Sequence, residues 1–107
     1  MSATAEIYMA GRSLLSELQA SLPDPSAWRN YGGELLYDGG GWQVLISEPE
    51  EVAPEEVPGS VRALQPYAHW QVSVALEPST AGLEGWALFE RVLEAIRSAT
   101  GGVSSES

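Results

Sequence analysis

The chain of 107 residues has no cysteine, no lysine and a single histidine. The absence of cysteine excludes disulfides, thiolate zinc sites and a cysteine nucleophile, and it is typical of a reducing compartment or of a core that needs no disulfide. Only five cations, all arginines, accompany 15 acidic residues, so the formal net charge is −10. Because nucleic acid repels a surface that carries no basic stripe, this balance argues against a nucleic-acid partner.

The sequence also has no long hydrophobic run. Its apolar stretches are far shorter than the roughly 20 residues that a membrane helix needs, and no basic start leads into an apolar segment at the N-terminus. We therefore expect no membrane partner and a cytoplasmic location. The length predicts one domain, over residues 1–102, while the small polar residues 103–107 predict a frayed C-terminal tail.

Three segments have the composition and alternation of β-strands. Residues 34–38 and 42–47 are separated by the glycines 39–41, and an aspartate followed by glycines between two such segments is a strong hairpin signal. In residues 69–77 apolar side chains alternate with polar or small ones without interruption, which predicts a half-buried strand. These segments predict an antiparallel sheet with one apolar face.

Amphipathic helices are expected on both sides of these strands in the sequence. Residues 83–99 place their apolar side chains on one half of the helical wheel, and Gly101 follows as a stop signal. The N-terminal segment allows two interpretations. A single helix from Ala3 to Leu22 is favoured because its apolar stripe continues for four turns; the alternative is a short strand, with a shorter helix after Gly11.

The predicted fold is α+β, a two-layer sandwich in which an antiparallel sheet of at least three strands is covered by two amphipathic helices. The order of elements is α-β-β-β-α. If the N-terminal segment is a strand, the order becomes β-α-β-β-β-α, close to a ferredoxin-like sandwich.

Acidic and aromatic residues mark a candidate surface for a partner. Five glutamates lie in a proline-broken segment, residues 48–58, which we expect to be a solvated loop. The connector before the first predicted strand contains tryptophan, arginine and tyrosine, the residue types that dominate interface hot spots. The candidate partner-binding residues are therefore Glu48, Glu50, Glu51, Glu55, Glu56, Trp28, Arg29 and Tyr31.

Catalytic signals are weak. No phosphate-binding loop is present, and the only imidazole, His69, is about 13 Å along its strand from Ser73, too far for a hydrogen bond. We expect no catalytic residue, no metal site and no cofactor. The alternative is a small-molecule binder or minor enzyme with a pocket between sheet and helices, whose polar groups would be Tyr37, His69 and Tyr67. A third hypothesis is a structural homodimer joined along a strand edge.

Small size, acidity and a sheet covered by two helices together resemble the plan of bacterial immunity proteins and of the small acidic chaperones of secretion systems. The resemblance implies a non-catalytic protein-binding module whose acidic surface meets a basic partner. Complementary charge would steer this association and set its specificity.

Overall fold

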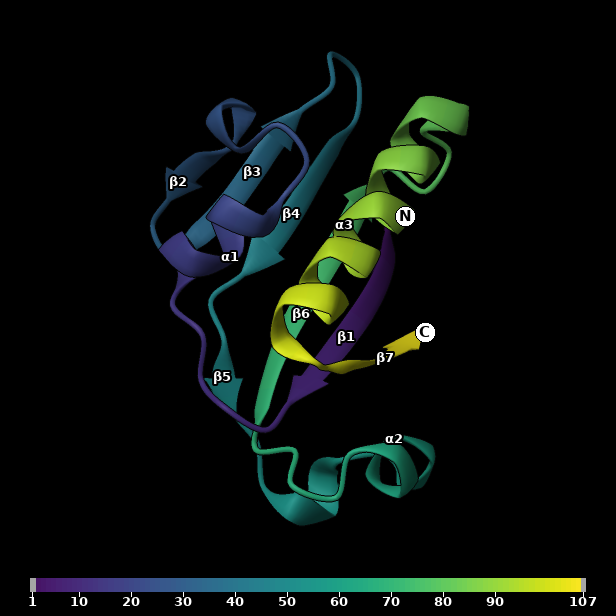
Figure 1. Cartoon of the computed structure of the whole chain (residues 1–107). Helices are drawn as coiled ribbons and strands as arrows, with labels where there is room; N and C mark the ends of the chain where they lie inside the picture. Colours follow the sequence, from purple (N-terminus) through teal and green to yellow (C-terminus); the bar gives the residue numbers. More distant parts are fainter. Residues whose placement is uncertain (1, 107) are drawn as a thin grey trace.

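The computed structural model of the chain describes residues 2–106 and contains one antiparallel sheet, three α-helices and two short 3-10 helices (Figure 1). In chain order the elements are β1 (Ala3–Met9), α1 (Leu15–Ser21), η1 (Pro25–Ala27), β2 (Arg29–Tyr31), β3 (Glu34–Asp38), β4 (Gln43–Ser47), β5 (Glu50–Glu51), η2 (Pro54–Glu56), α2 (Gly59–Leu64), β6 (Trp70–Glu77), α3 (Gly82–Thr100) and β7 (Val103–Glu106).

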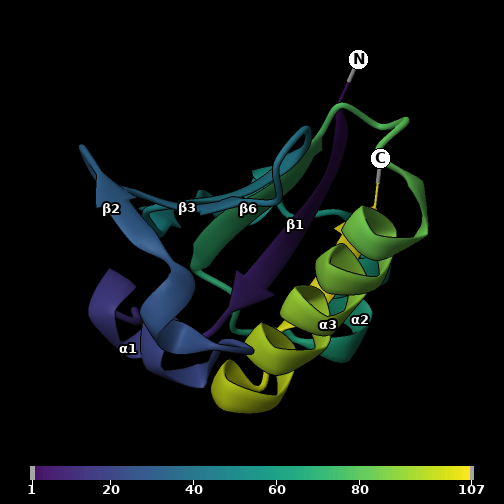
Figure 2. The same ribbon diagram turned by 90° about the horizontal axis from the view of Figure 1, so that it is seen from above.

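The sheet has the strand order β2-β3-β4-β6-β1-β7, and β5 pairs with the start of β6 beside this path. Every described pair of neighbouring strands is antiparallel. Helices α1 and α3 lie on the same face of the sheet (Figure 2). The predicted α+β class, an antiparallel sheet covered by helices, is thus confirmed.

The N-terminal segment is a strand, so the favoured prediction of one helix from Ala3 to Leu22 is wrong. All seven residues of β1 pair with β6, and residues 5–8 of β1 also pair with β7. The side chains of Ala5, Ile7 and Met9 are fully buried on the helix-covered face. A helical stripe is a local preference, and pairing on both edges of the strand overrides it here. Helix α1 starts at Leu15, where the Leu14 N–H donates to the Glu17 carboxylate at 2.8 Å.

The main hydrophobic core lies between the sheet and the two helices. The strands present an unbroken apolar surface there, and α3 covers it with one apolar face while α1 closes one end. Burying each large side chain of this kind contributes about 1.5–3 kcal/mol. The buried residues are Ala5, Ile7, Met9, Leu18, Leu22, Trp28, Leu35, Val44, Ile46, Val72, Val74, Leu76, Phe89, Val92, Leu93 and Ile96.

The predicted hairpin joins β3 to β4 as expected. The Asp38 carboxylate accepts the Gly40 N–H at 2.9 Å, and Gly40 has a φ of 77°. A Cβ at position 39 would collide with the Trp42 ring, so this position has no room for a side chain. The turn therefore needs its glycines both for conformation and for close contact.

A smaller cluster forms at the other end of the sheet. Its buried members come from β1 and from the segment between β5 and β6: Tyr8, Val52, Val57, Val61 and Ala68. The Arg62 guanidinium donates to the Pro54 carbonyl and, at 3.3 Å, to the Val57 carbonyl. The predicted loop 48–58 is thus solvated at its glutamates but is fixed by β5, η2 and these apolar anchors.

The C-terminal segment is also a strand, contrary to the predicted frayed tail over residues 103–107. Strand β7 pairs with β1, and the Arg97 guanidinium donates to Ser104 Oγ at 2.6 Å. Gly101, with a φ of 69°, turns the chain out of α3, and Gly102 passes close to Ile7 and to the Tyr8 backbone. Short polar side chains suit an edge strand whose stability comes from backbone pairing. Ser107 lies outside the described residues.

Candidate functional site

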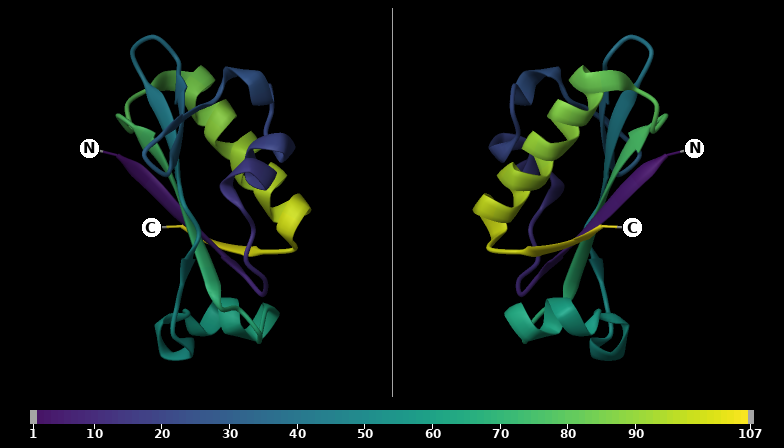
Figure 3. Two further views of the ribbon diagram at one scale, coloured as in Figure 1. Left: turned by 90° about the vertical axis from the view of Figure 1, so that its left-hand side faces the viewer. Right: turned by 90° about the vertical axis from the view of Figure 1, so that its right-hand side faces the viewer.

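The face of the sheet turned away from α1 and α3 has no helix lying across it within residues 2–106 (Figures 2 and 3). Only at one end does the segment containing η2 and α2 close over Tyr8. We call this surface the open face. Alternation and strand register assign to it Thr4, Glu6, Tyr8, Arg29, Tyr31, Glu34, Leu36, Asp38, Gln43, Leu45, Ser47, Gln71, Ser73, Ala75 and Glu77.

Strand register aligns an apolar row across the middle of the open face. Leu36 lies opposite Leu45, and Leu45 lies opposite Ala75. All three side chains are partly buried. Because neighbouring strands lie about 4.8 Å apart, the three side chains form a continuous apolar row about 10 Å long.

Carboxylates border this apolar row on both sides. One border row contains Asp38, Gln43 and Glu77 on adjacent strands, and Gln43 Nε2 donates to Glu77 Oε2 at 3.2 Å. Residues two positions apart on a strand are separated by about 7 Å, so this row lies about 7 Å from the apolar row.

The other border row runs through β3, β4, β6 and β1. Glu34 lies opposite Ser47, whose hydroxyl accepts the Ser73 N–H at 2.9 Å, and Ser73 lies opposite Glu6. The apolar row is therefore enclosed between two polar rows that each hold two carboxylates.

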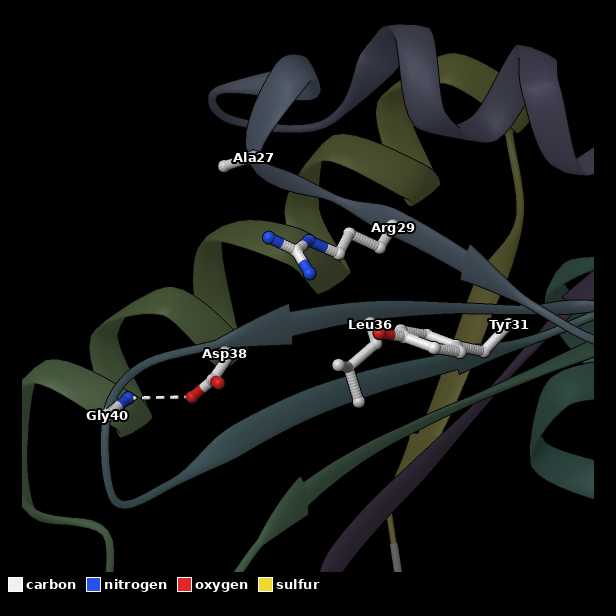
Figure 4. A pocket seen from close by; sticks show the side chains of 6 residues that line it. All are labelled: Ala27, Arg29, Tyr31, Leu36, Asp38 and Gly40. Carbon is white, nitrogen blue, oxygen red and sulfur yellow. Dashed lines mark hydrogen bonds between the residues drawn. The ribbon is translucent and has the colours of Figure 1, made fainter.

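The open face is hollowed where the apolar row meets the edge strand β2. This hollow has a volume of about 390 Å³ and is lined by Ala27, Arg29, Tyr31, Leu36, Asp38 and Gly40. Figure 4 shows Arg29 and Tyr31 extending from β2 over β3, with Asp38 at the hairpin end. Among the described residues assigned to the open face, Arg29 is the one cation.

The predicted contact patch of Trp28, Arg29 and Tyr31 is divided between the two faces of the sheet. Trp28 is only 3% exposed and belongs to the core, so its assignment to the patch is corrected. Its indole N–H donates to the Pro23 carbonyl at 3.1 Å, and its ring lies 5.5 Å from that of Tyr37. Arg29 and Tyr31 lie on the open face, and Tyr31 is 58% exposed. The tryptophan of this connector thus covers the core and is not part of the exposed surface.

All five predicted glutamates of the segment 48–58 are exposed. Glu50 lies opposite Gln71, at the α2 end of the open face. Burial raises the pKa of the Tyr8 hydroxyl above its ordinary value, and the negative charges of Glu6 and Glu56 raise it further. Glu50 and Glu56 therefore extend the negative charge of the open face toward α2.

The residues of the predicted small-molecule pocket are not brought together. Tyr37 lies opposite Val44, beside the C-terminal end of β6, and its ring packs between Trp28 and Trp42 at centroid distances of 5.5 and 5.9 Å. His69 precedes the start of β6. It lies about 23 Å along that strand from Leu76, the residue opposite Val44. Tyr67, near His69, is 73% exposed.

Residues 2–106 contain no group of three or more metal-ligating side chains that could hold a metal ion. Among the helices of these residues, none combines the length and the hydrophobicity of a transmembrane segment. Comparisons with protein-family models, curated proteins and solved structures found no match to this chain.

The open face was not identified from the sequence, although one signal for it exists. Leu45 stands between Val44 and Ile46, and Leu36 follows Leu35. Because successive residues of a strand point to opposite faces, each strand must place a leucine on the side away from the core. That these leucines are neighbours, and that carboxylates flank them, depends on the strand register.

Proposed function

We propose that the protein is a non-catalytic protein-binding module that meets a basic partner through its open face. One observation carries this proposal: a sheet face without a covering helix within residues 2–106 has an apolar row enclosed by carboxylates on both sides. This role belongs to the same class as that of the small acidic immunity proteins and chaperones that the sequence resembles.

The chemistry of the open face suits a cationic protein surface. Glu34 and Asp38 are exposed, and each can form a surface ion pair, which contributes about 0.2–1 kcal/mol. The partly buried leucines between the carboxylate rows add apolar contact area. The net charge of −10 would also accelerate encounter with a basic partner and make association salt-dependent.

The alternative acidic surface is the outer side of α3, which provides a matched control. Glu84, Glu90 and Glu94 are exposed there, and neutralising three carboxylates on either surface changes the net charge from −10 to −7. The two triple variants are E34Q/D38N/E77Q on the open face and E84Q/E90Q/E94Q on α3. The amide oxygens introduced at positions 38 and 77 can still accept the hydrogen bonds that the Asp38 and Glu77 carboxylates accept.

The experiment measures binding of a fluorescent oligolysine peptide by anisotropy, between about 20 and 300 mM salt. We expect the open-face variant to lose about fivefold to tenfold in affinity at low salt and the α3 variant less than about threefold. Equal losses would mean that binding follows net charge alone, and they would contradict the proposal. Urea unfolding of both variants checks that each is folded.

A further inference from the structure

We infer that the open face accommodates a basic amphipathic helix, which lies across the strands along the row of Leu36, Leu45 and Ala75. Lysine or arginine side chains on both flanks of its apolar stripe would meet the two carboxylate rows. This inference rests on the proposed function and specifies the kind of partner.

The dimensions of the open face favour a helix. An α-helix with its side chains is about 10–12 Å wide, and its apolar stripe covers one side. The carboxylate rows lie about 7 Å to each side of the apolar row, within reach of long cationic side chains on the flanks of such a helix. An extended segment added to the free edge of β2 would leave the apolar row uncovered.

The charge of this chain argues against a second copy of it as the partner that docks on the open face. A second copy would bring another net charge of −10. Its longest described helix, α3, carries Glu84, Glu90 and Glu94 on its solvent side, which would face the carboxylates of the open face. The complementary helix must therefore come from a basic protein.

The hollow at β2 provides a place for an anchor. Tyr31 and Leu36 line it at one end of the apolar row, and its volume is about 390 Å³. A large apolar side chain of the docked helix would fit against the Tyr31 ring and the aliphatic part of Arg29. Aromatic anchors of this type commonly dominate interface energetics.

The test compares two peptides of about 16 residues, long enough to form a helix when bound. In the patterned peptide, leucines follow a helical stripe and lysines flank it on both sides; the shuffled peptide has the same composition without a stripe. We expect the patterned peptide to bind about tenfold more tightly and to gain helicity on binding. The double variant L36S/L45S is expected to reduce this preference to less than about twofold, because both peptides would then be bound mainly through the carboxylate rows.

The possible failures are distinguishable. Equal affinity for the two peptides would overturn the helix inference, and a preference that survives in L36S/L45S would overturn the assigned position. Neither result affects the charge comparison between the open face and α3, on which the proposed function depends. If L36S/L45S does not fold, the comparison of the two peptides on the wild-type chain still decides whether a helix is recognised.

Discussion

The two faces of the sheet are made from alternate residues of the same strands, and their chemistry differs. On β4, Val44 and Ile46 point into the core and have no exposed surface, whereas Gln43 and Leu45 point to the open face and are partly exposed. The buried residues of the described chain are hydrophobic or otherwise uncharged, and the carboxylates of residues 2–105 all lie outside the core. Folding therefore depends chiefly on the covered face, and the proposed binding surface lies on the other face.

The largest expected difference in stability is between substitutions at Trp28 and at Tyr31. Trp28 directly precedes β2, and Tyr31 is the last residue of β2. Trp28→Ala removes a buried ring from the core and should lower the free energy of unfolding by about 3–5 kcal/mol. Tyr31→Ala, on the open face, should change it by less than about 0.5 kcal/mol. Urea unfolding measures both, and similar losses would contradict the division of these residues between the two faces.

A second comparison uses adjacent residues of β4. Ile46→Ala creates a cavity in the core and should cost about 2–5 kcal/mol, whereas Leu45→Ala on the open face should cost less than about 1.5 kcal/mol. The measurement is again the midpoint and slope of urea unfolding. A larger loss for Leu45→Ala would show that the open face is part of the core.

A third prediction concerns β7, the strand at one edge of the sheet. Ending the chain after Gly102 removes β7, its pairing with β1 and the Arg97–Ser104 hydrogen bond. We expect a loss of about 1–3 kcal/mol, since each net hydrogen bond contributes about 0.5–1.5 kcal/mol. Thermal unfolding of the shortened chain checks this, and an unchanged melting temperature would support the frayed tail expected from the sequence.

The smallest expected effect is on the pH dependence of stability. It concerns Tyr8, which lies on the open face and is buried in the smaller cluster with Val57 and Val61. Its raised pKa means that folding favours the neutral hydroxyl, so this contribution is complete below the unfolded pKa of about 10 and is lost as pH rises above it. Tyr8→Phe should therefore lose less stability than the wild type between neutral and strongly alkaline pH. Tyr67→Phe at an exposed position is the control, and identical alkaline profiles for Tyr8→Phe and wild type would contradict the prediction.

Local patterns in the sequence predicted the elements that local forces determine. The alternation in β6, the glycines of the β3–β4 hairpin and the apolar face of α3 all led to the correct element. The N-terminal strand was only the second of two interpretations and the C-terminal strand was not predicted, because β1 pairs with β6 and β7, far away in the sequence.

The candidate site was even less accessible to sequence analysis. Leu36, Leu45 and Ala75 become neighbours only through the register of three strands, and so do the carboxylates beside them. The exposure of Arg29 and the burial of Trp28 likewise follow from where β2 joins the sheet edge.

Methyl NMR of the wild-type chain titrated with the patterned peptide tests the central claim most directly. The account predicts that the methyl resonances of Leu36 and Leu45 shift and show contacts with the peptide leucines, while those of Leu35 and Ile46 on the covered face do not. Leu83 on α3, which is 91% exposed, serves as the internal control for non-specific apolar contact. Shifts centred on Leu83, with Leu36 and Leu45 unchanged, would contradict the assignment of the open face as the docking surface.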